Sequence, residues 1–221
     1  MSDYKVGYLI GSLATQSINR KLAMALVRLA PPELEMTEIS FKDLPLYSYD
    51  YDANYPPVAT RFKDAIASVD AVLFVTPEYN RSIPGGLKNA IDWASRPYGK
   101  NSFTRKPSSA IIGTSPGAIG TAIAQQSLRN VLAFCNSPQM NAIEAYIQFK
   151  PGLITDQGEV TNAETEMFLR GVSDRIQRIH CESLHRIAQA HLEDTQSILS
   201  QGAWSVVRSA YVLIRDSIYG N

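Results

Sequence analysis

The chain has few cysteines and no excess of charge of either sign. Cys135 and Cys181 are its only two cysteines among 221 residues, and their separation fits neither a CxxC redox motif nor a zinc knuckle. We therefore expect two reduced thiols and a cytoplasmic location. Lysine and arginine together number 21, as do aspartate and glutamate, so the formal net charge is zero. No long-range field then favours nucleic acid or an anionic membrane, and any anion site must be local.

Long hydrophobic runs are also missing. No stretch reaches the roughly 20 apolar residues needed to span a membrane. The opening segment MSDYKVGYLIG has no basic region ahead of a long apolar core, so we interpret it as leading into a first strand rather than as a signal peptide. With 45% hydrophobic residues, the chain can form one α/β domain over residues 1–190, and residues 191–221 are expected to form a C-terminal helical extension.

Strand and helix patterns alternate along this domain, without internal repeats. The predicted strands are residues 5–10, 34–39, 70–75 and 108–113, with a fifth, weaker strand inside 139–148. The predicted helices are residues 17–29, 58–68, 87–94, 119–134 and 161–190. Five strands with intervening helices predict an α/β fold, a doubly wound parallel sheet of flavodoxin-like order 2-1-3-4-5.

Such a sheet binds ligands outside the carboxyl ends of its strands, where the strand order reverses. The loops expected there are residues 11–17, 76–86 and 114–120. In the first, the hydroxyls of Ser12, Thr15 and Ser17 precede a helix whose free N–H groups attract a phosphate dianion. The alternative is that Ser17 is only a helix N-cap. Because neither GxxxxGK[ST] nor GxGxxG occurs at this loop, a mononucleotide phosphate is favoured.

The second loop, PEYNRSIPGGLKNAIDW from Pro77 to Trp93, follows a continuous apolar strand and combines a flat ring, an amide and a Pro-Gly-Gly turn. These groups suit a planar, hydrogen-bonding ligand. The third loop, Thr114 to Gly120, has two glycines and a Pro-Gly turn that let backbone N–H groups approach the edge of a heteroaromatic ring.

The segments GSLATQSIN, TPEYNRSIPGGLKNAIDW and GTSPGAIG resemble the NADPH-dependent FMN reductase family of flavodoxin-like quinone, chromate and azo-dye reductases. The resemblance, over about residues 4 to 188, implies noncovalent FMN and hydride transfer from NADPH or NADH to the flavin. A quinone, azo compound, free flavin or metal oxyanion would then be reduced. Loop chemistry and resemblance together assign cofactor-binding roles to Ser12, Thr15, Ser17, Ile18, Asn19, Pro77, Glu78, Tyr79, Asn80, Ser82, Thr114, Ser115 and Gly117. Tyr79 and Asn80 are expected to border the reacting ring, while no protein residue is expected to be catalytic.

Two positions depart from the family pattern, one near the flavin phosphate and one that bears on subunit contacts. Many members carry Arg where this chain has Ala14, near the flavin phosphate, and Arg20 or Arg81 is a candidate substitute. A second basic position is Ile123 here. The alternatives are a nonenzymatic electron-transfer flavodoxin, which the neutral charge disfavours, and a partner-binding module without flavin.

Several other residues are interpreted as structural. His180, His185 and His191 are spaced so that they do not share one helix face, and we expect no metal site. Nothing brings Asp92 and Glu144 together as an acid pair. Glu78 is equally compatible with bracing its own loop or contacting a partner subunit.

Two segments suggest assembly. Residues 43–57 form a long loop rich in Tyr, Asp and Pro, a candidate lid or partner contact. Residues 197–219 carry a broad apolar helical stripe that is expected to pack on this domain or on a second subunit, with a membrane-surface role as the alternative. The family resemblance implies a homodimer or homotetramer in which a second subunit borders each flavin site.

Overall fold

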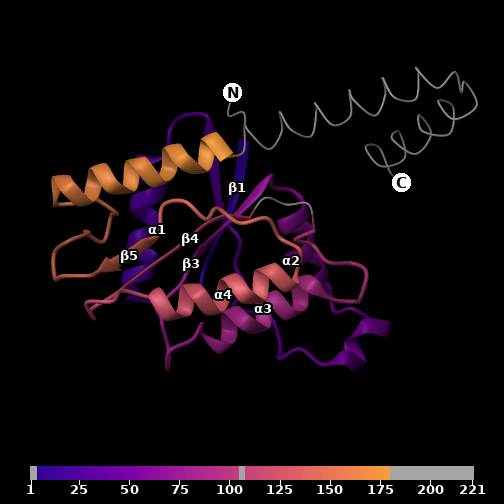
Figure 1. The fold of residues 1–221 in the computed structure, drawn as a ribbon. Coiled ribbons are helices and arrows are strands. Elements are labelled where there is room, and N and C mark those ends of the chain that lie inside the picture. Colours follow the sequence, from indigo (N-terminus) through magenta and orange to yellow (C-terminus); the bar gives the residue numbers. More distant parts are fainter. Residues whose placement is uncertain (1–3, 105–107, 180–221) are drawn as a thin grey trace, which may run out of the picture. The chain divides into compact units, whose positions relative to one another are not determined.

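The computed structural model describes residues 4–104 and 108–179. Its strands form one parallel five-stranded sheet in the order β2-β1-β3-β4-β5, which confirms the predicted order (Figure 1). The strands are β1 (Tyr4–Ile10), β2 (Leu34–Glu38), β3 (Ala71–Val75), β4 (Ser108–Ser115) and β5 (Ala145–Gln148). The helices are α1 (Ile18–Leu29), α2 (Pro57–Ala67), α3 (Gly85–Ser95) and α4 (Ala122–Phe134), and a further helix covers residues 163–179.

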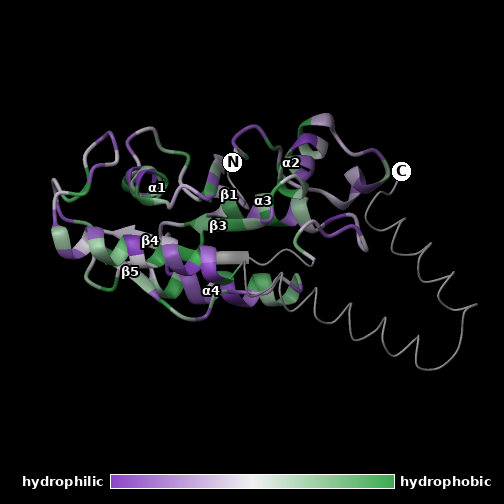
Figure 2. Ribbon diagram, turned by 90° about the horizontal axis from the view of Figure 1, so that it is seen from above, coloured by the Kyte–Doolittle hydropathy of each residue, from purple (hydrophilic) through white to green (hydrophobic). Residues whose placement is uncertain are grey.

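β3 lies at the centre of the sheet, between β1 and β4, and all five of its side chains are buried. Its β-branched and aromatic composition suits a strand that is covered on both faces. Successive side chains point to opposite faces, so Val72 and Phe74 join one core cluster and Leu73 and Val75 join the other. Figure 2 shows the hydrophobic residues concentrated in this central part of the sheet.

Two helical layers cover the sheet. α2, α3 and α4 contribute to the cluster around Phe74, whereas α1 and the helix over residues 163–179 contribute to the cluster around Leu73. In the described part of the chain, the loops after β1, β3 and β4 lie at the carboxyl ends of these strands, where the sequence predicted the ligand to bind.

The expected helix over residues 119–134 begins later than predicted. Ile119 is outside α4, because Gly120 adopts a φ of +59° and turns the chain before Ala122. A Cβ atom at Gly120 would lie 2.8 Å from the Tyr146 carbonyl carbon, so this position requires glycine for space as well as for conformation.

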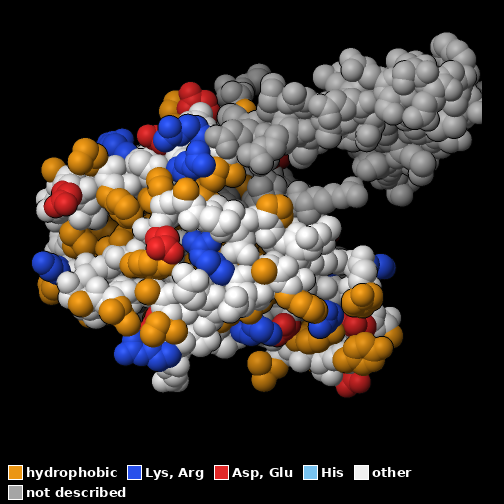
Figure 3. Space-filling view, viewed as in Figure 1, with side chains coloured by type: hydrophobic (Ala, Val, Ile, Leu, Met, Phe, Trp, Pro, Cys, Tyr) orange, Lys and Arg blue, Asp and Glu red, His pale blue; other side chains and the backbone are white. Residues whose placement is uncertain are grey.

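The predicted helix over residues 161–190 is observed from residue 163 to residue 179, where the described part of the chain ends. The division at residue 190, the apolar stripe over residues 197–219, Cys181 and the three histidines lie outside the described residues. Within the described ranges, no helix combines the length and apolarity that a bilayer span requires. On the face in Figure 3, basic and acidic side chains are interspersed with hydrophobic and uncharged ones.

The Tyr-rich loop is anchored on α3. Tyr47, Tyr51 and Tyr55 surround Trp93, with ring centroids 5.1, 5.3 and 5.0 Å from the indole. Trp93 is fully buried, as expected for a core residue, and its Nε1 donates to the Pro45 carbonyl at 2.7 Å. These contacts hold the polar loop against α3. Tyr49 and Tyr51 remain 79% and 38% exposed, and the partner contact of this loop stays a prediction.

Candidate functional site

Three loops meet at the carboxyl ends of β1, β3 and β4. A Cβ atom at Gly11, after β1, would lie 3.1 Å from the Pro77 ring, and one at Gly86 would lie 3.7 Å from Leu13. A Cβ at Gly113, near the end of β4, would lie 2.1 Å from the Thr76 carbonyl oxygen. The backbones are thus closely apposed, and the glycines permit this approach. The structure brings the predicted loops together.

The first loop has the composition of an anion site. Ser12 and Ser17 are buried, and the Ser17 hydroxyl accepts a hydrogen bond from Arg20 N–H at 3.3 Å, so Ser17 is the N-cap of α1. Among the described residues, no acceptor receives the backbone N–H groups of residues 15–19. Thr15 is exposed beside them, and Ile18 is the first residue of α1. Consecutive free N–H groups at the positive end of a helix fit a phosphate dianion.

Asn19 is close to this cradle, but its side chain is engaged elsewhere. Its amide nitrogen donates to the Thr114 carbonyl at 2.9 Å, and its amide oxygen accepts from Thr114 N–H at 3.0 Å. Thr114 is itself buried and donates its hydroxyl to the Ile147 carbonyl. In this arrangement the side chains of Asn19 and Thr114 position the first loop against the third, and the cofactor-binding role of both residues stays a prediction.

The second loop contains a tight turn in an unusual conformation. Asn80 and Arg81 have φ values of +50° and +62°, and Tyr79 and Ser82 exchange two backbone hydrogen bonds of 2.9 and 3.0 Å. Two consecutive positive φ values define a type I′ turn, which normally favours glycine. Such strain is retained where a loop serves a function. The turn presents the Asn80 amide outward, beside the half-exposed ring of Tyr79.

Glu78 anchors this turn to the amino end of α4. Its Oε2 accepts hydrogen bonds from Ile123 N–H at 3.0 Å and from Ala124 N–H at 3.1 Å, and its Oε1 pairs with Arg81 at 3.0 Å. The carboxylate is therefore a bracing group within the subunit, one of the alternatives that the sequence left open. Pro77, immediately before it, is buried.

The third loop is held by its own residues. The Ser115 hydroxyl donates to the Gly120 carbonyl at 2.7 Å and accepts from Gly117 N–H at 3.2 Å. Gly117 is exposed, with only Ser115 Oγ near the position of a Cβ. A planar ligand edge can thus approach the Gly117 backbone closely.

Two side chains at the edge of the site are not among the residues predicted from the sequence. Leu13 is 58% exposed, and Phe41, buried after β2, lies 3.5 Å from the position of a Cβ on Gly86. A leucine inside a polar loop is visible in the sequence and could have indicated an apolar contact at the site. The position of Phe41 depends on how β2 packs against α3. The proposed substitutes for arginine at Ala14 are already paired: Arg20 forms a two-bond fork with Glu38, which raises its pKa, and Arg81 pairs with Glu78.

The other acidic candidates are not brought together. Asp92 pairs with Lys88 at 2.7 Å, and Glu144 accepts from the Tyr146 hydroxyl at 2.7 Å. Each carboxylate has its own partner, so neither forms an acid pair with the other. This agrees with a site in which a bound cofactor carries the chemistry.

The fold and the three loops define a flavodoxin-like protein with a mononucleotide site. The model of the NADPH-dependent FMN reductase family matches residues 4–152. The chain is 48% identical over 171 residues to a 2-hydroxy-1,4-benzoquinone reductase of a Burkholderia species, covering 77% of this chain and 93% of that protein. It is 47% identical over 173 residues to a quinone reductase of Pseudomonas putida, covering 78% of this chain and 92% of that protein. A solved structure, the NAD(P)H:(acceptor) oxidoreductase FerB of Paracoccus denitrificans, matches with a TM-score of 0.74 and 45% identity, covering 79% of this chain and 98% of that one.

The chain belongs to the NADPH-dependent FMN reductase family. It is accordingly an oxidoreductase that uses FMN and NAD(P)H, as the sequence motifs predicted. The cradle at residues 15–19 fits the FMN phosphate, because it offers donors and helix-dipole charge where the described residues provide no acceptor. Membership of an enzyme family argues against the electron-carrier and flavin-free alternatives.

Proposed function

We propose that this protein is an FMN-dependent NAD(P)H:quinone oxidoreductase. The observation that carries the proposal is the meeting of a donor-rich phosphate cradle with the type I′ turn at Tyr79 to Ser82. Relatives at 47–48% identity that are named for quinone reduction support the choice of a quinone as acceptor. Azo compounds, free flavin and metal oxyanions such as chromate are secondary candidate acceptors.

Each loop has a distinct task in this proposal. The free N–H groups of residues 15–19, with Ser12 and Ser17, hold the phosphate and fix one end of the cofactor. The Asn80 amide and the Gly117 backbone orient the edge of the ring, and Tyr79 borders the face at which substrates bind. When bound, FMN supplies the hydride-accepting and hydride-donating chemistry, so the protein needs no acid of its own.

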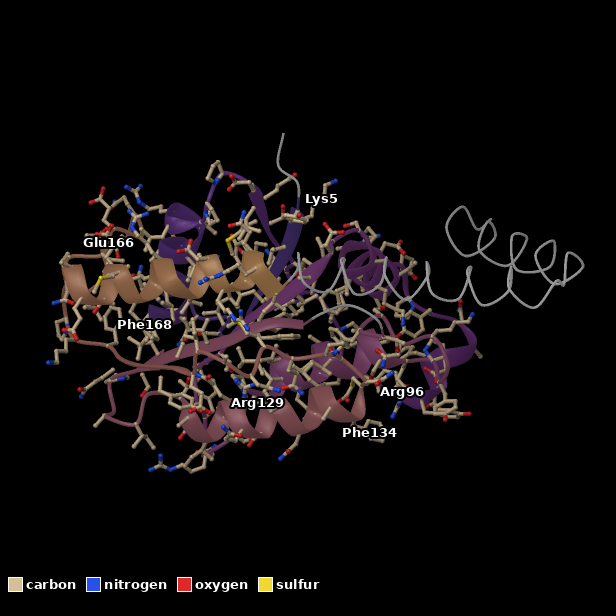
Figure 4. The ribbon with its side chains drawn as sticks, turned by 45° about the horizontal axis from the view of Figure 1, so that its top comes forward. Lys5, Arg96, Arg129, Phe134, Glu166 and Phe168 are labelled. Carbon is tan, nitrogen blue, oxygen red and sulfur yellow. The ribbon has the colours of Figure 1, made fainter. Side chains whose placement is uncertain are left out.

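Assembly is part of the proposal. Tyr79, Ile119 and Ile123 expose 50%, 47% and 41% of their surfaces next to the second and third loops. Burial of these side chains against a second copy would stabilise a homodimer or homotetramer and shield the substrate site. Light scattering should give at least twice the monomer mass, and Ile123→Lys should shift it toward monomer. Phe134→Lys, at the exposed end of α4, is a control that should keep the mass (Figure 4).

Titration and turnover test the function directly. The purified protein should bind FMN, and reduction of the bound flavin by NADPH should bleach its absorbance; added benzoquinone should restore it. Ser17→Ala should weaken FMN binding about tenfold, the scale of one lost charge-assisted hydrogen bond. Ser68→Ala, whose hydroxyl caps α2 away from the loops, should leave binding unchanged. Failure of the FMN-loaded protein to oxidise NADH or NADPH with a quinone would refute the proposal.

A further inference from the structure

A groove opens beside the first loop, between β2 and α2. A cavity of about 280 Å³ is lined by residues 38–44 together with Val58, Arg61, Phe62 and Ala65. A second cavity of about 80 Å³ shares residues 38–42 with it and extends to Leu13. Together they lie just above the lower end of the size range of ligand sites, about 300 Å³. The groove suits one end of a dinucleotide rather than a whole one.

The groove is continuous with the flavin-binding loops. Leu13 belongs both to its lining and to the first loop. Phe41 also lines the groove, and it lies 3.5 Å from the position that a Cβ atom on Gly86, at the start of α3, would occupy. Gly86 closes the second loop. A substrate that reacts beside Tyr79 and Asn80 can therefore extend along Leu13 and Phe41 into the groove.

The charges of the groove favour an anion. Arg20 and Glu38 neutralise each other through two hydrogen bonds of 2.8 and 2.9 Å. Lys42 and Arg61 also line the groove, and neither side chain has a hydrogen-bonding or ion-pair partner among residues 4–104 and 108–179. Asp43 lines it too and opposes them, so the surplus is one positive charge in a chain whose net charge is zero.

The walls of the groove suit a flat base. Phe41 and Phe62 are buried aromatic residues in its lining, and Val58 adds an apolar side chain. An aromatic floor with cations at the rim is the combination that accommodates an adenine ring and a phosphate. We propose that this groove binds the 2′-phosphorylated adenosine half of NADPH and that Lys42 and Arg61 determine the preference for NADPH over NADH. The inference rests on the proposed use of a nicotinamide nucleotide at the adjoining flavin site.

Two nonreducing probes test the groove without turnover. The FMN-loaded protein is titrated calorimetrically with adenosine 2′,5′-bisphosphate and with 5′-AMP. The bisphosphate should bind about tenfold more tightly, the scale of one charge-assisted contact. This preference should fall toward unity in Lys42→Gln and Arg61→Gln and should increase in Asp43→Asn, because that change removes a repelling carboxylate. The ratio of kcat/KM for NADPH to that for NADH should move in parallel.

Charge-matched controls separate the groove from the net charge. Lys5→Gln removes a cation at the amino end of β1 (Figure 4). Arg28→Gln removes one on α1, where Arg28 pairs with Glu159. Both positions are away from the groove, so both variants should keep the preference. Equal affinity of the wild-type protein for both probes, or an unchanged preference in the Lys42→Gln, Arg61→Gln double variant, would overturn the inference. FMN binding and NADH oxidation are measured separately, so their loss would count against the proposed function and not against the groove.

Discussion

The side-chain amide of Asn19 pairs with the backbone of Thr114 through two hydrogen bonds, 2.9 Å to the carbonyl and 3.0 Å from the N–H. Both residues are buried, and 95 positions separate them in the chain. The amide thus extends the hydrogen bonding of the sheet from β4 to the start of α1. It fixes the phosphate cradle relative to the third loop without itself being free to bind the phosphate.

Asn19→Ala should lower the free energy of unfolding by about 2–4 kcal/mol, because it leaves a buried N–H and a buried C=O unpaired. Urea unfolding followed by circular dichroism measures this difference. Asn130→Ala, at an exposed position of α4, is the control and should change stability by about 0.5 kcal/mol or less. A loss in Asn19→Ala no larger than in the control would show that the pairing contributes little.

The type I′ turn gives a second prediction. Asn80→Gly should be neutral or slightly stabilising, because glycine adopts φ = +50° without strain, whereas Asn80→Val should destabilise by about 1–2 kcal/mol. Asn80→Gly should nevertheless lower NADPH:quinone turnover, because it removes the amide while keeping the backbone. Thermal unfolding and steady-state kinetics on both variants separate conformation from chemistry. Full turnover in Asn80→Gly would show that the Asn80 amide has no role at the reacting site.

The fold was predictable because its determinants are local. The continuous apolar run of β3 and the hydroxyl-rich start of α1 indicate a buried strand and a capped helix by periodicity and composition alone. The three loops indicated a site for a phosphate and a planar ring, because the composition of each loop is also a local property of the sequence. The second loop lies after β3, as the sequence predicted, and its role at the flavin stays a prediction. Its type I′ turn is not evident from the sequence, because neither Asn80 nor Arg81 is glycine.

What the sequence left open depends on distant packing. Whether Asn19 points to a phosphate or to Thr114 is decided by the approach of α1 to β4, and Glu78 reaches Ile123 across 45 positions. Tyr47 and Tyr55 pack on Trp93, which lies 38 positions after Tyr55 in the chain. Spacing rules carry no information on such contacts.

Glu78 should stabilise the protein through the amino end of α4. Glu78→Ala removes the acceptor of two N–H groups and a favourable charge near the helix dipole, so unfolding should cost about 1–2 kcal/mol less. Glu78→Gln keeps a hydrogen-bond acceptor, so its free energy of unfolding should fall by about half as much. Added salt should reduce the difference in stability between the wild type and Glu78→Gln, because it screens the charge of the carboxylate. Glu166→Ala breaks an exposed ion pair with Arg170 and should cost about 0.5 kcal/mol or less (Figure 4). Equal losses at residues 78 and 166 would contradict the bracing role.

The anchoring of the Tyr-rich loop should make stability sensitive to high pH. The Tyr47 hydroxyl donates to Asp52 at 2.8 Å, and burial, with a contribution from Asp52, raises the pKa of Tyr47 to about 12. An unfolded tyrosine ionises near pH 10, so between about pH 10 and 12 the folded chain holds a proton that the unfolded chain has lost. The contribution of Tyr47 to stability is therefore complete below pH 10 and is lost as the pH rises toward 12.

Tyr47→Phe should be less stable than the wild type at pH 8, and the difference should shrink by pH 11. In a Trp204→Phe background, fluorescence of Trp93, which the loop tyrosines surround, reports detachment of the loop during urea titrations at each pH. Tyr98→Phe, at a 92% exposed position, should follow the wild-type pH profile, and the same profile in Tyr47→Phe would show that the buried hydroxyl does not link the loop to pH.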